Sequence, residues 1–351
     1  MFLVGDSLTA PPSLDGEGTF EMKFIVFPGQ ASQYPGMAKD WFDNFKEAQM
    51  AFEEASDFSG LNLSKLCFEG SEADLKATEI TQPAILTSCM AIWRSLKNYC
   101  DLEKLKSDSL FAGHSLGEYS ALVAMSALDL GPAAKFVRSR GAAMQEAVPA
   151  GIGGMLALLF KPKTLTAIEE AQKICKEASS SSTQVWVANY NAAEQIVLAG
   201  HKSAIDKAQA IASSGNFNCR QAIPLEVSAP FHCPLMQKAA DKLIDEIQKL
   251  EIKESPSRYI ANVDAKVYKI SSVEEAQKVR ERLSLQITAS VYWTQSAEEA
   301  LVQGARQLLE IGPKRVLSGL CKRVQKDGAQ FEISNIDRKE DIENVKSILS
   351  A

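Results

Sequence analysis

The stretch "FAGHSLGEYSA", residues 111–121, places Ser115 between Gly113 and Gly117 directly after a short apolar run. A serine on a sharp turn between a strand and a helix can act as a nucleophile. The turn exposes the hydroxyl, and the helix N-terminus presents free N–H groups to a developing oxyanion. The same pattern also occurs in ordinary loops. It favours nucleophilic catalysis by Ser115, with a structural turn as the alternative.

A serine nucleophile needs a base, and the chain holds only three histidines. His114 adjoins Ser115 on the predicted strand, so its side chain should leave on the opposite face. His201 begins an amphipathic helical pattern, where a solvated histidine is the simplest interpretation. His232 lies between prolines just before a helix, where a stiff loop can hold a side chain toward a cleft. Elimination makes His232 the candidate base, with a structural histidine as the alternative.

The elements around Ser115 must position it. "KFIVFPGQ", from residue 23, is an apolar run ended by Pro28 and Gly29, which is typical of a buried parallel strand that opens into a loop. "SLFAGHS" predicts another strand, and "LGEYSALVAMSAL" the helix that follows it. This strand, turn and helix form a nucleophile elbow. We therefore predict an α/β fold: a large α/β-hydrolase-like domain with a parallel sheet and a nucleophile elbow.

A second pattern lies between Ser115 and His232. Over residues 152–225 the chain alternates as strand, helix, two strands, helix and strand. This β-α-β-β-α-β order predicts a small ferredoxin-like α+β domain. We expect this domain to be inserted into the large catalytic domain, which then consists of residues 22–151 and 226–351. The ligand cleft should lie between the two domains.

The composition excludes several function classes. The chain has 351 residues, 46% hydrophobic side chains and a formal net charge of −6, so no overall field attracts nucleic acid or an anionic membrane. No apolar run approaches the ~20 residues that span a bilayer. Seven scattered cysteines without a CxxC pair argue against disulfides and a zinc site. We expect a cytoplasmic protein without a metal, preceded by a disordered leader or tether at 1–21.

Eight ordered blocks then carry a family resemblance. They cover about residues 22–324 and occur in the order seen in malonyl-CoA:acyl carrier protein transacylases and the acyltransferase domains of polyketide synthases. Eight blocks in the same order are far more specific evidence of a resemblance than the serine motif alone. The blocks are "FPGQASQYPGM", "GHSLGEYSALVA", "RSRGAAMQEA", "ANYNAAEQIVLAG", "SAPFHCPLM", "NVDAKVY", "YWTQSAEEAL" and "LLEIGPKRVLSGLCKRV".

The resemblance implies a ping-pong reaction. Ser115 matches the serine that takes a malonyl group from coenzyme A and passes it to the phosphopantetheine thiol of a carrier protein. His232 matches the base, which a backbone carbonyl orients in this family; the matching position in "NVDA" is Asn262. We do not expect the nearby Asp264 to act as a catalytic acid. No bound cofactor is implied, because the coenzyme A thioester is the donor substrate.

The resemblance also assigns binding residues. Gln30 and the backbone N–H of Leu116 match the two sides of the oxyanion hole, and Arg140 matches the arginine that pairs with the malonyl carboxylate. Phe231 precedes the histidine. In the acyltransferase domains of polyketide synthases, a phenylalanine at this position is associated with malonyl rather than methylmalonyl as the substrate group. Gln195 matches a position near the active site.

One residue departs from the family pattern: Ala31 stands where the family has glycine in "GQGSQ". If that position needs a positive φ, alanine is strained there and could shift the oxyanion hole.

A basic set near the C-terminus suggests a docking surface for an acidic carrier protein. We expect part of this set to lie on a helix that begins near Pro313, with a solvated surface as the alternative. The basic residues are Lys314, Arg315, Lys322, Arg323 and Lys326.

The alternative function is that of an acyl hydrolase acting on carrier-protein thioesters. The pathway can be fatty acid or polyketide synthesis. We expect the protein to be a monomer.

Overall fold

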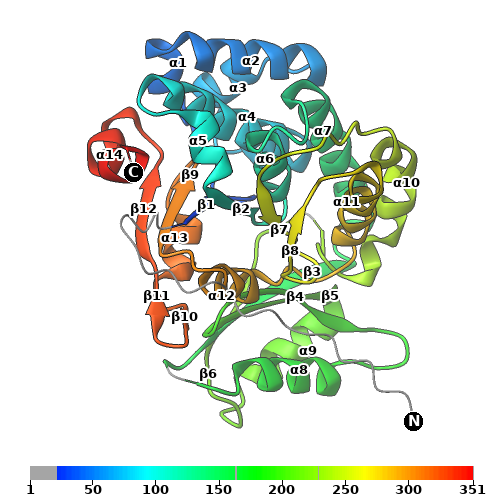
Figure 1. Ribbon diagram of the computed structural model, residues 1–351. Coiled ribbons are helices and arrows are strands. Elements are labelled where there is room, and N and C mark those ends of the chain that lie inside the picture. The colour runs from blue at the N-terminus through cyan, green and yellow to red at the C-terminus, as the bar shows by residue number, and fades with distance from the viewer. Residues whose placement is uncertain (1–21, 163, 228, 351) are drawn as a thin grey trace, which may run out of the picture.

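The computed structural model describes residues 22–162, 164–227 and 229–350, which form two main sheets with helices around them (Figure 1). The leader or tether expected at residues 1–21 lies outside the described residues. Among the described helices, none has both the length and the apolar composition needed to cross a membrane.

A six-stranded sheet forms the centre of the larger part of the molecule. Its strands follow the order β12-β9-β1-β2-β7-β8, and all neighbours are parallel except β7 and β8. The predicted α/β fold with a parallel sheet is therefore confirmed. The strands are β1 (Lys23–Phe27), β2 (Ser109–Gly113), β7 (Arg258–Ile260), β8 (Val267–Lys269), β9 (Gln307–Ile311) and β12 (Glu332–Ile336).

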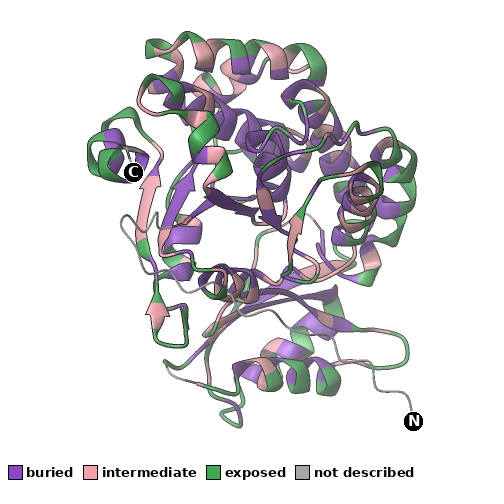
Figure 2. Cartoon of the chain, viewed as in Figure 1, coloured by how far each residue is buried: buried purple, intermediate pink, exposed green. Residues whose placement is uncertain are grey.

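Helices cover both faces of this sheet, which explains why its central strands are continuous apolar runs. In β1, Ile25 and Phe27 join the cluster that contains α2, α4 and α6, whereas Phe24 and Val26 join the cluster with α12 and α13. Figure 2 shows the central strands and α6 as buried. The helices are α1 (Lys39–Asn44), α2 (Lys46–Ser59), α3 (Leu63–Glu69), α4 (Thr78–Ser95), α5 (Leu102–Ser107), α6 (Gly117–Ala124), α7 (Leu130–Glu146), α10 (Gln237–Gln248), α11 (Val273–Gln286), α12 (Trp293–Val302), α13 (Val316–Cys321) and α14 (Ile342–Ser350).

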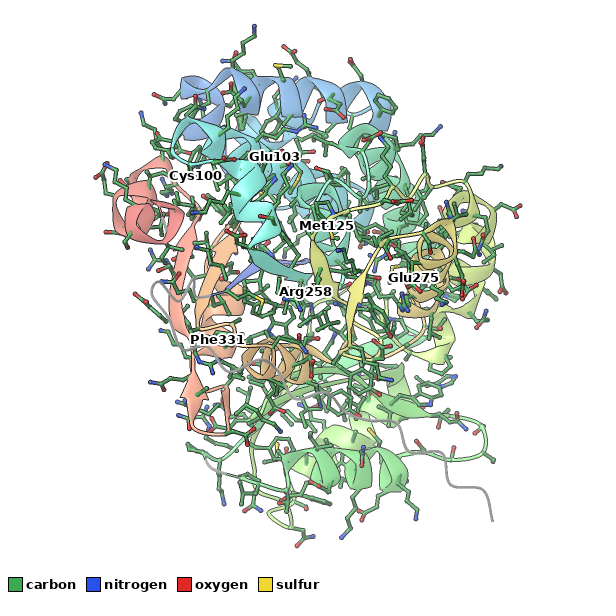
Figure 3. The ribbon with its side chains drawn as sticks, in the orientation of Figure 1. Cys100, Glu103, Met125, Arg258, Glu275 and Phe331 are labelled. Carbon is green, nitrogen blue, oxygen red and sulfur yellow. The ribbon has the colours of Figure 1, made fainter. Side chains whose placement is uncertain are left out.

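Side chains from distant segments fill the space around the sheet (Figure 3). Phe331 lies between the short strand β11 (Ala329–Gln330), which pairs with β10 (Gln325–Lys326), and β12. Its ring stacks on Phe24 of β1 with centroids 5.7 Å apart. At the other edge, Arg258 of β7 donates to the Gln303 side-chain oxygen over 3.1 Å. These contacts attach the C-terminal segments to the central strands.

The second sheet has four antiparallel strands in the order β4-β5-β3-β6. Two helices pack on it and form a separate hydrophobic cluster with its strands. The sheet meets the larger part where Tyr190 of β4 donates its N–H to the Val291 carbonyl over 2.9 Å. The elements, in the β-α-β-β-α-β order that the sequence predicts, are β3 (Gly153–Phe160), α8 (Ala167–Ala178), β4 (Val185–Ala192), β5 (Gln195–His201), α9 (Lys202–Ala212) and β6 (Cys219–Pro224).

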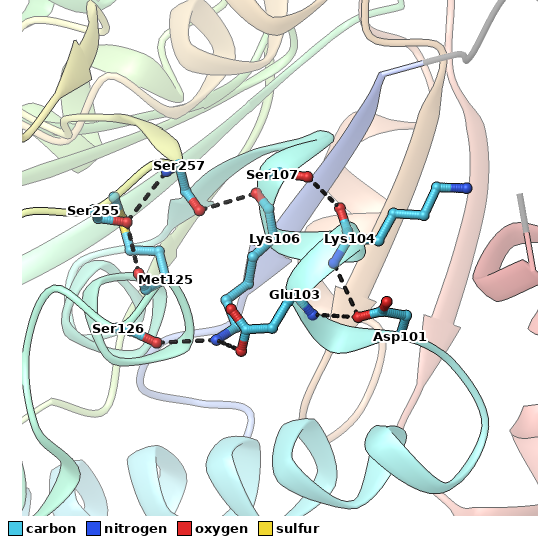
Figure 4. A network of polar contacts seen from close by, with 9 residues as sticks. All are labelled: Asp101, Glu103, Lys104, Lys106, Ser107, Met125, Ser126, Ser255 and Ser257. Carbon is cyan, nitrogen blue, oxygen red and sulfur yellow. Dashed lines mark hydrogen bonds and ion pairs between the residues drawn. The ribbon is translucent and has the colours of Figure 1, made fainter.

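A polar network joins the outer ends of the elements that flank Ser115 (Figure 4). Lys106, just before β2, donates to the Ser126 hydroxyl over 3.1 Å in the turn after α6. The Lys106 carbonyl accepts from the Ser257 hydroxyl over 2.9 Å, ahead of β7. The Ser255 hydroxyl donates to the Met125 carbonyl over 2.7 Å. The network therefore ties the start of β2 to the end of α6 and to β7.

Candidate active site

The chain reverses sharply at Ser115, between β2 and α6. Ser115 has a φ of 54°, in the left-handed region that non-glycine residues rarely adopt. A Cβ atom on Gly113 would lie 2.0 Å from the Gly117 backbone, and one on Gly117 would lie 2.1 Å from the Phe27 carbonyl oxygen. Both positions therefore require glycine, because the turn, the helix and β1 approach within backbone contact. The geometry is that of the nucleophile elbow predicted from the sequence.

His232 faces the serine hydroxyl. The Ser115 Oγ and His232 Nε2 atoms are 2.7 Å apart, and His232 Nδ1 lies 2.9 Å from the backbone carbonyl oxygen of Gln286. A carbonyl only accepts, so Nδ1 carries the ring proton and Nε2 is left to accept the serine proton. Burial, and next the charge of Arg140, lowers the pKa of His232 to about 3. The imidazole is therefore neutral and able to act as a base at physiological pH.

The assignment of Asn262 as the residue that orients the histidine is wrong. Its backbone carbonyl accepts from the Tyr292 N–H over 2.9 Å, so it is already engaged elsewhere. The orienting carbonyl belongs to Gln286, at the end of α11. Sequence reasoning missed Gln286 because every residue has a backbone carbonyl, and nothing in an amphipathic helical pattern marks the one that meets a distant histidine.

Asn262 instead shapes the elbow. Its side-chain oxygen accepts the Ser115 N–H over 2.6 Å, and its amide nitrogen donates to the Gly113 carbonyl over 2.7 Å. Asp264 is exposed, and its two carboxylate oxygens accept from the Lys266 N–H and the Tyr268 hydroxyl. The expectation that Asp264 is not a catalytic acid agrees with this placement.

The other two histidines lie elsewhere. His114 is half-buried, with Nε2 2.8 Å from the Asn191 side-chain oxygen, which links the elbow to the smaller sheet. His201 precedes α9, and its Nδ1 atom accepts the Gln184 N–H over 3.0 Å. Neither ring contacts Ser115, so the elimination that selected His232 agrees with the structure.

Arg140 reaches the site from α7. It is 1% exposed, and its Nη2 atom lies 3.2 Å from the Ser115 Oγ. Nη1 donates to the Gln82 side-chain oxygen over 2.8 Å and Nη2 donates to that of Gln286 over 2.9 Å. Among the described residues, no carboxylate forms an ion pair with this guanidinium. The site thus holds a buried cation whose hydrogen-bond partners are neutral, which suits it to an anionic substrate group.

The candidate oxyanion hole adjoins the elbow. Gln30 is half-buried in the turn after β1, and Leu116 is buried at the start of α6. A Cβ atom on Gly29 would lie 2.4 Å from the His114 carbonyl oxygen, so this turn packs directly on the elbow backbone. Ala31 has a φ of 82°, the positive value that the family glycine suggested. The turn keeps its shape despite the strain, and the Lys314 ammonium donates to the Ala31 carbonyl over 3.3 Å.

Two further predicted site residues, Phe231 and Gln195, lie in different surroundings. Phe231 precedes His232 in the chain, is 8% exposed and belongs to the main hydrophobic cluster. Gln195, at the start of β5, lines a cavity of about 480 Å³ between the smaller sheet and α13. Neither Ser115 nor His232 lines that cavity. Phe231 is therefore next to the base in the chain, and Gln195 lies in a cavity that the dyad does not line.

The expectation that part of the basic set lies on a helix beginning near Pro313 is wrong, because α13 (Val316–Cys321) contains none of the five residues. A helix cannot begin at Pro313 because Lys314 has a φ of 64°, and α13 begins only at Val316. Arg315 pairs with Asp341 over 3.5 Å, and Arg323 forms an ion pair with Glu194. Lys322 and Lys326 are exposed, and the described residues offer neither of them an ion-pair partner.

Comparison with known proteins identifies the family of this chain. A model of the acyl transferase domain family matches residues 24–346. The malonyl CoA-acyl carrier protein transacylase of Salmonella typhimurium is 39% identical over 300 residues, covering 86% of this chain and 92% of the relative. The protein of that name from Bacillus subtilis is 37% identical over 306 residues, covering 86% and 90%.

Solved structures share the fold. The acyl-carrier-protein-S-malonyltransferase from Bartonella henselae superposes with a TM-score of 0.84 at 33% identity, covering 93% of this chain and 99% of its own. A malonyl-transacylase in complex with its type II PKS acyl-carrier protein gives a TM-score of 0.82 at 36% identity, with coverage of 93% and 99%. The chain belongs to the acyl transferase domain family, among the malonyl CoA-acyl carrier protein transacylases.

Proposed function

We propose that this protein transfers a malonyl group from coenzyme A to the phosphopantetheine thiol of an acyl carrier protein. The observation that carries the proposal is the buried guanidinium of Arg140, 3.2 Å from the Ser115 hydroxyl. A cation at this distance can hold the free carboxylate of a dicarboxylic acyl group while the thioester carbon reaches Ser115. The relatives named malonyl CoA-acyl carrier protein transacylases support the same reaction.

In the first half-reaction, the Nε2 atom of His232 accepts the hydroxyl proton as the Ser115 oxygen attacks the thioester carbonyl. A C–O bond forms, the C–S bond to coenzyme A breaks, and His232 returns the proton to the departing sulfur. The Gln30 side chain and the Leu116 N–H stabilise the negative charge on the carbonyl oxygen. The product is a malonyl ester of Ser115 and free coenzyme A.

In the second half-reaction, the carrier thiol gives its proton to His232 and attacks the ester carbonyl. The C–O bond to Ser115 breaks, and the serine oxygen takes the proton back. The two half-reactions use the same groups in the same roles, as a ping-pong mechanism requires. No cofactor enters either step.

The acyl pocket favours malonyl over its α-methyl analogue. Phe231 lies immediately before His232 in the chain and is almost fully buried. We propose that its ring crowds the space that an α-methyl group would need. Gln195 lines the neighbouring cavity together with Lys322, and we assign it to the approach of the substrate rather than to the reacting centre.

We infer that the exposed lysines of the basic set contribute to carrier docking. Lys322 and Lys326 suit an acidic partner because no described residue neutralises them by an ion pair. A relative solved with its type II PKS acyl-carrier protein supports a carrier as partner. The seven cysteines, which all lie in the described ranges, are free thiols; this supports a cytoplasmic location. We propose that the protein acts as a monomer.

We also propose the domain boundaries given by the sequence. Residues 22–151 and 226–351 would form the α/β-hydrolase-like catalytic domain, and residues 152–225 an inserted ferredoxin-like domain. The hydrophobic cluster that α8 and α9 form with one face of the smaller sheet supports this division. The strand order β4-β5-β3-β6 supports the ferredoxin-like assignment, since it places the first and third strands of the unit at the centre of the sheet.

Intact mass after mixing the protein with malonyl-CoA alone tests the reaction. We expect one malonyl adduct, absent from Ser115→Ala, that disappears when an acyl carrier protein is added and reappears on the carrier. Coenzyme A release without an adduct, and faster than the carrier is loaded, would indicate an acyl hydrolase instead. No adduct and no coenzyme A release would contradict malonyl-CoA as the donor.

A further inference from the structure

Glu118 is a buried carboxyl group that the serine and histidine chemistry does not use. It lies in the first turn of α6, three residues after Ser115, and is 1% exposed. Its Oε2 atom accepts the side-chain N–H of Gln286 over 2.6 Å and the backbone N–H of Asn262 over 3.3 Å. A buried carboxyl group is costly without a compensating role. Its two partners both belong to the candidate active site.

The Gln286 side chain bridges Glu118 to Arg140. Its Nε2 atom donates to Glu118, and its Oε1 atom accepts from the Arg140 Nη2 atom over 2.9 Å. A guanidinium can only donate, and Glu118 Oε2 accepts. The two neighbours therefore allow one orientation of the amide: oxygen toward Arg140 and nitrogen toward Glu118. Gln286 itself is 1% exposed, so water does not compete for either contact.

The bridge also keeps the Glu118 carboxyl group away from the guanidinium. A carboxylate in direct contact with Arg140 would form a bidentate pair and occupy the guanidinium. With the Gln286 amide between them, Glu118 holds the arginine through a neutral group. The Nη2 edge of Arg140 thus remains directed at Ser115, where the carboxylate of a bound acyl group is expected.

We propose that Glu118 is a positioning residue for the acyl carboxylate, acting through the Gln286 amide to aim Arg140 at the substrate. This inference rests on the proposed malonyl transfer and names a group that holds Arg140 in place to bind the free carboxylate of the acyl chain. Glu118 itself does not touch the substrate.

The two roles of Gln286 are separable. Its backbone carbonyl, which orients His232, is placed by the end of α11, whereas its side-chain amide is held by Glu118. The amide also donates to the Ser115 carbonyl over 3.0 Å, a contact that does not involve Glu118. Loss of the carboxyl group should therefore weaken carboxylate binding and leave the Ser115 and His232 dyad intact.

Two readouts on Glu118→Ala test this separation. We expect the malonyl-CoA concentration for half-maximal adduct formation to rise about ten-fold, the effect of weakening one charged hydrogen bond. Labelling of Ser115 by a fluorophosphonate, which has no carboxylate, should keep its wild-type rate. Glu118→Gln retains an oxygen acceptor for Gln286 and should restore most of the affinity. Equal loss in both readouts, or loss in neither, would overturn the proposal.

Two further variants control for a folding defect. Gln286→Met removes the amide contacts to Glu118, Arg140 and the Ser115 carbonyl, so it should lose malonyl affinity at least as strongly as Glu118→Ala, and adding Glu118→Ala should cause no further loss of that affinity. Glu310 is another buried carboxyl group, which accepts from the Leu317 and Ser318 N–H groups and not from Gln286. Glu310→Ala should lower stability without changing the ratio of the two readouts. A wild-type protein that takes the fluorophosphonate but no malonyl would refute the proposed function instead.

Discussion

The Nη2 atom of Arg140 lies 3.2 Å from the Oγ atom of Ser115, so the guanidinium touches the atom expected to carry the acyl group. A malonyl ester on Ser115 would place its free carboxylate within reach of this cation. We predict that Arg140→Ala slows malonyl ester formation about 10- to 100-fold, because a hydrogen bond to a charged group contributes about 1.5–3 kcal/mol. Quenched intact-mass time courses at subsaturating malonyl-CoA measure this rate.

A neighbouring arginine supplies the control for this prediction. Arg138 lies on the same helix, but its Nη1 atom donates to the Ser59 carbonyl over 2.6 Å, away from the site. Arg138→Ala should form the malonyl ester at the wild-type rate. Arg140→Lys should recover little, because an ammonium cannot make the two parallel hydrogen bonds of a guanidinium. Equal losses at both positions would show that the charge acts at long range rather than by contact.

The depressed pKa of His232 predicts an unusual pH profile. Burial and then the Arg140 charge lower this pKa from 6.5 to about 3, with a smaller effect of the same sign from His114. The base must be neutral, so activity is lost only when the pH falls through the lowered pKa. We expect the rate of Ser115 labelling by a fluorophosphonate to stay on its plateau well below pH 6.

Removing Arg140 tests the cause of that shift. In Arg140→Ala the nearest positive charge is gone, so the His232 pKa should rise and the acid limb should move to higher pH. The labelling reagent carries no carboxylate, which keeps the measurement independent of malonyl binding. An acid limb near pH 6.5 in the unmodified protein would mean that the imidazole is more solvated than its 5% exposure indicates.

Ala31 stores backbone strain beside the candidate oxyanion hole. Its φ of 82° lies where a Cβ atom costs about 1 kcal/mol, and its side chain is exposed, so little packing is lost on truncation. We predict that Ala31→Gly raises the free energy of unfolding by about 0.5–1 kcal/mol. Chemical denaturation of both proteins, fitted with a common m-value, measures this difference.

Ala38 provides a matched comparison. Its φ is 59°, but its methyl group is buried, so Ala38→Gly relieves strain and loses apolar contact together. The net change at Ala38 should be smaller than at Ala31 or destabilising. A destabilised Ala31→Gly would show that the turn holds no strain and that alanine fits the position without cost.

The sequence predicts the nucleophile elbow well because its determinants are local. Gly113, Ser115 and Gly117 lie within five residues, and the backbone contacts that require the two glycines follow from the turn itself. His232 could be found because the chain offers few other bases. The strand and helix order of residues 152–225 was predictable for the same reason, since each element has its own periodic pattern.

The remaining site residues depend on contacts that no local pattern encodes. The Gln286 carbonyl meets a histidine 54 residues earlier in the chain, and its amide meets groups from α6 and α7. The start of α13 likewise depends on a residue outside the helix. The Glu310 carboxyl group in β9 accepts the Leu317 and Ser318 N–H groups in the first turn of α13. Such positions become visible only when the fold brings the segments together.

Carrier docking can be tested on Lys322 and Lys326, which follow α13 and have no ion-pair partner among the described residues. We predict that Lys322→Glu with Lys326→Glu raises the KM for an acyl carrier protein several-fold at 0.15 M salt, because carrier proteins are acidic. The rate of malonyl ester formation from malonyl-CoA should not change. Steady-state transfer at varied carrier concentration, beside single-turnover adduct formation, separates the two effects.

The same charge reversal at a distant site is the control. Lys46 and Lys65 are exposed on α2 and α3, at the end of the molecule opposite the smaller sheet (Figure 1). Their double exchange to glutamate produces the same net charge but should leave the carrier KM unchanged at 0.15 M salt, where charges farther apart than about 8 Å are screened. Equal effects from both pairs would mean that the carrier responds to net charge, and that the Lys322 and Lys326 surface is not its docking site.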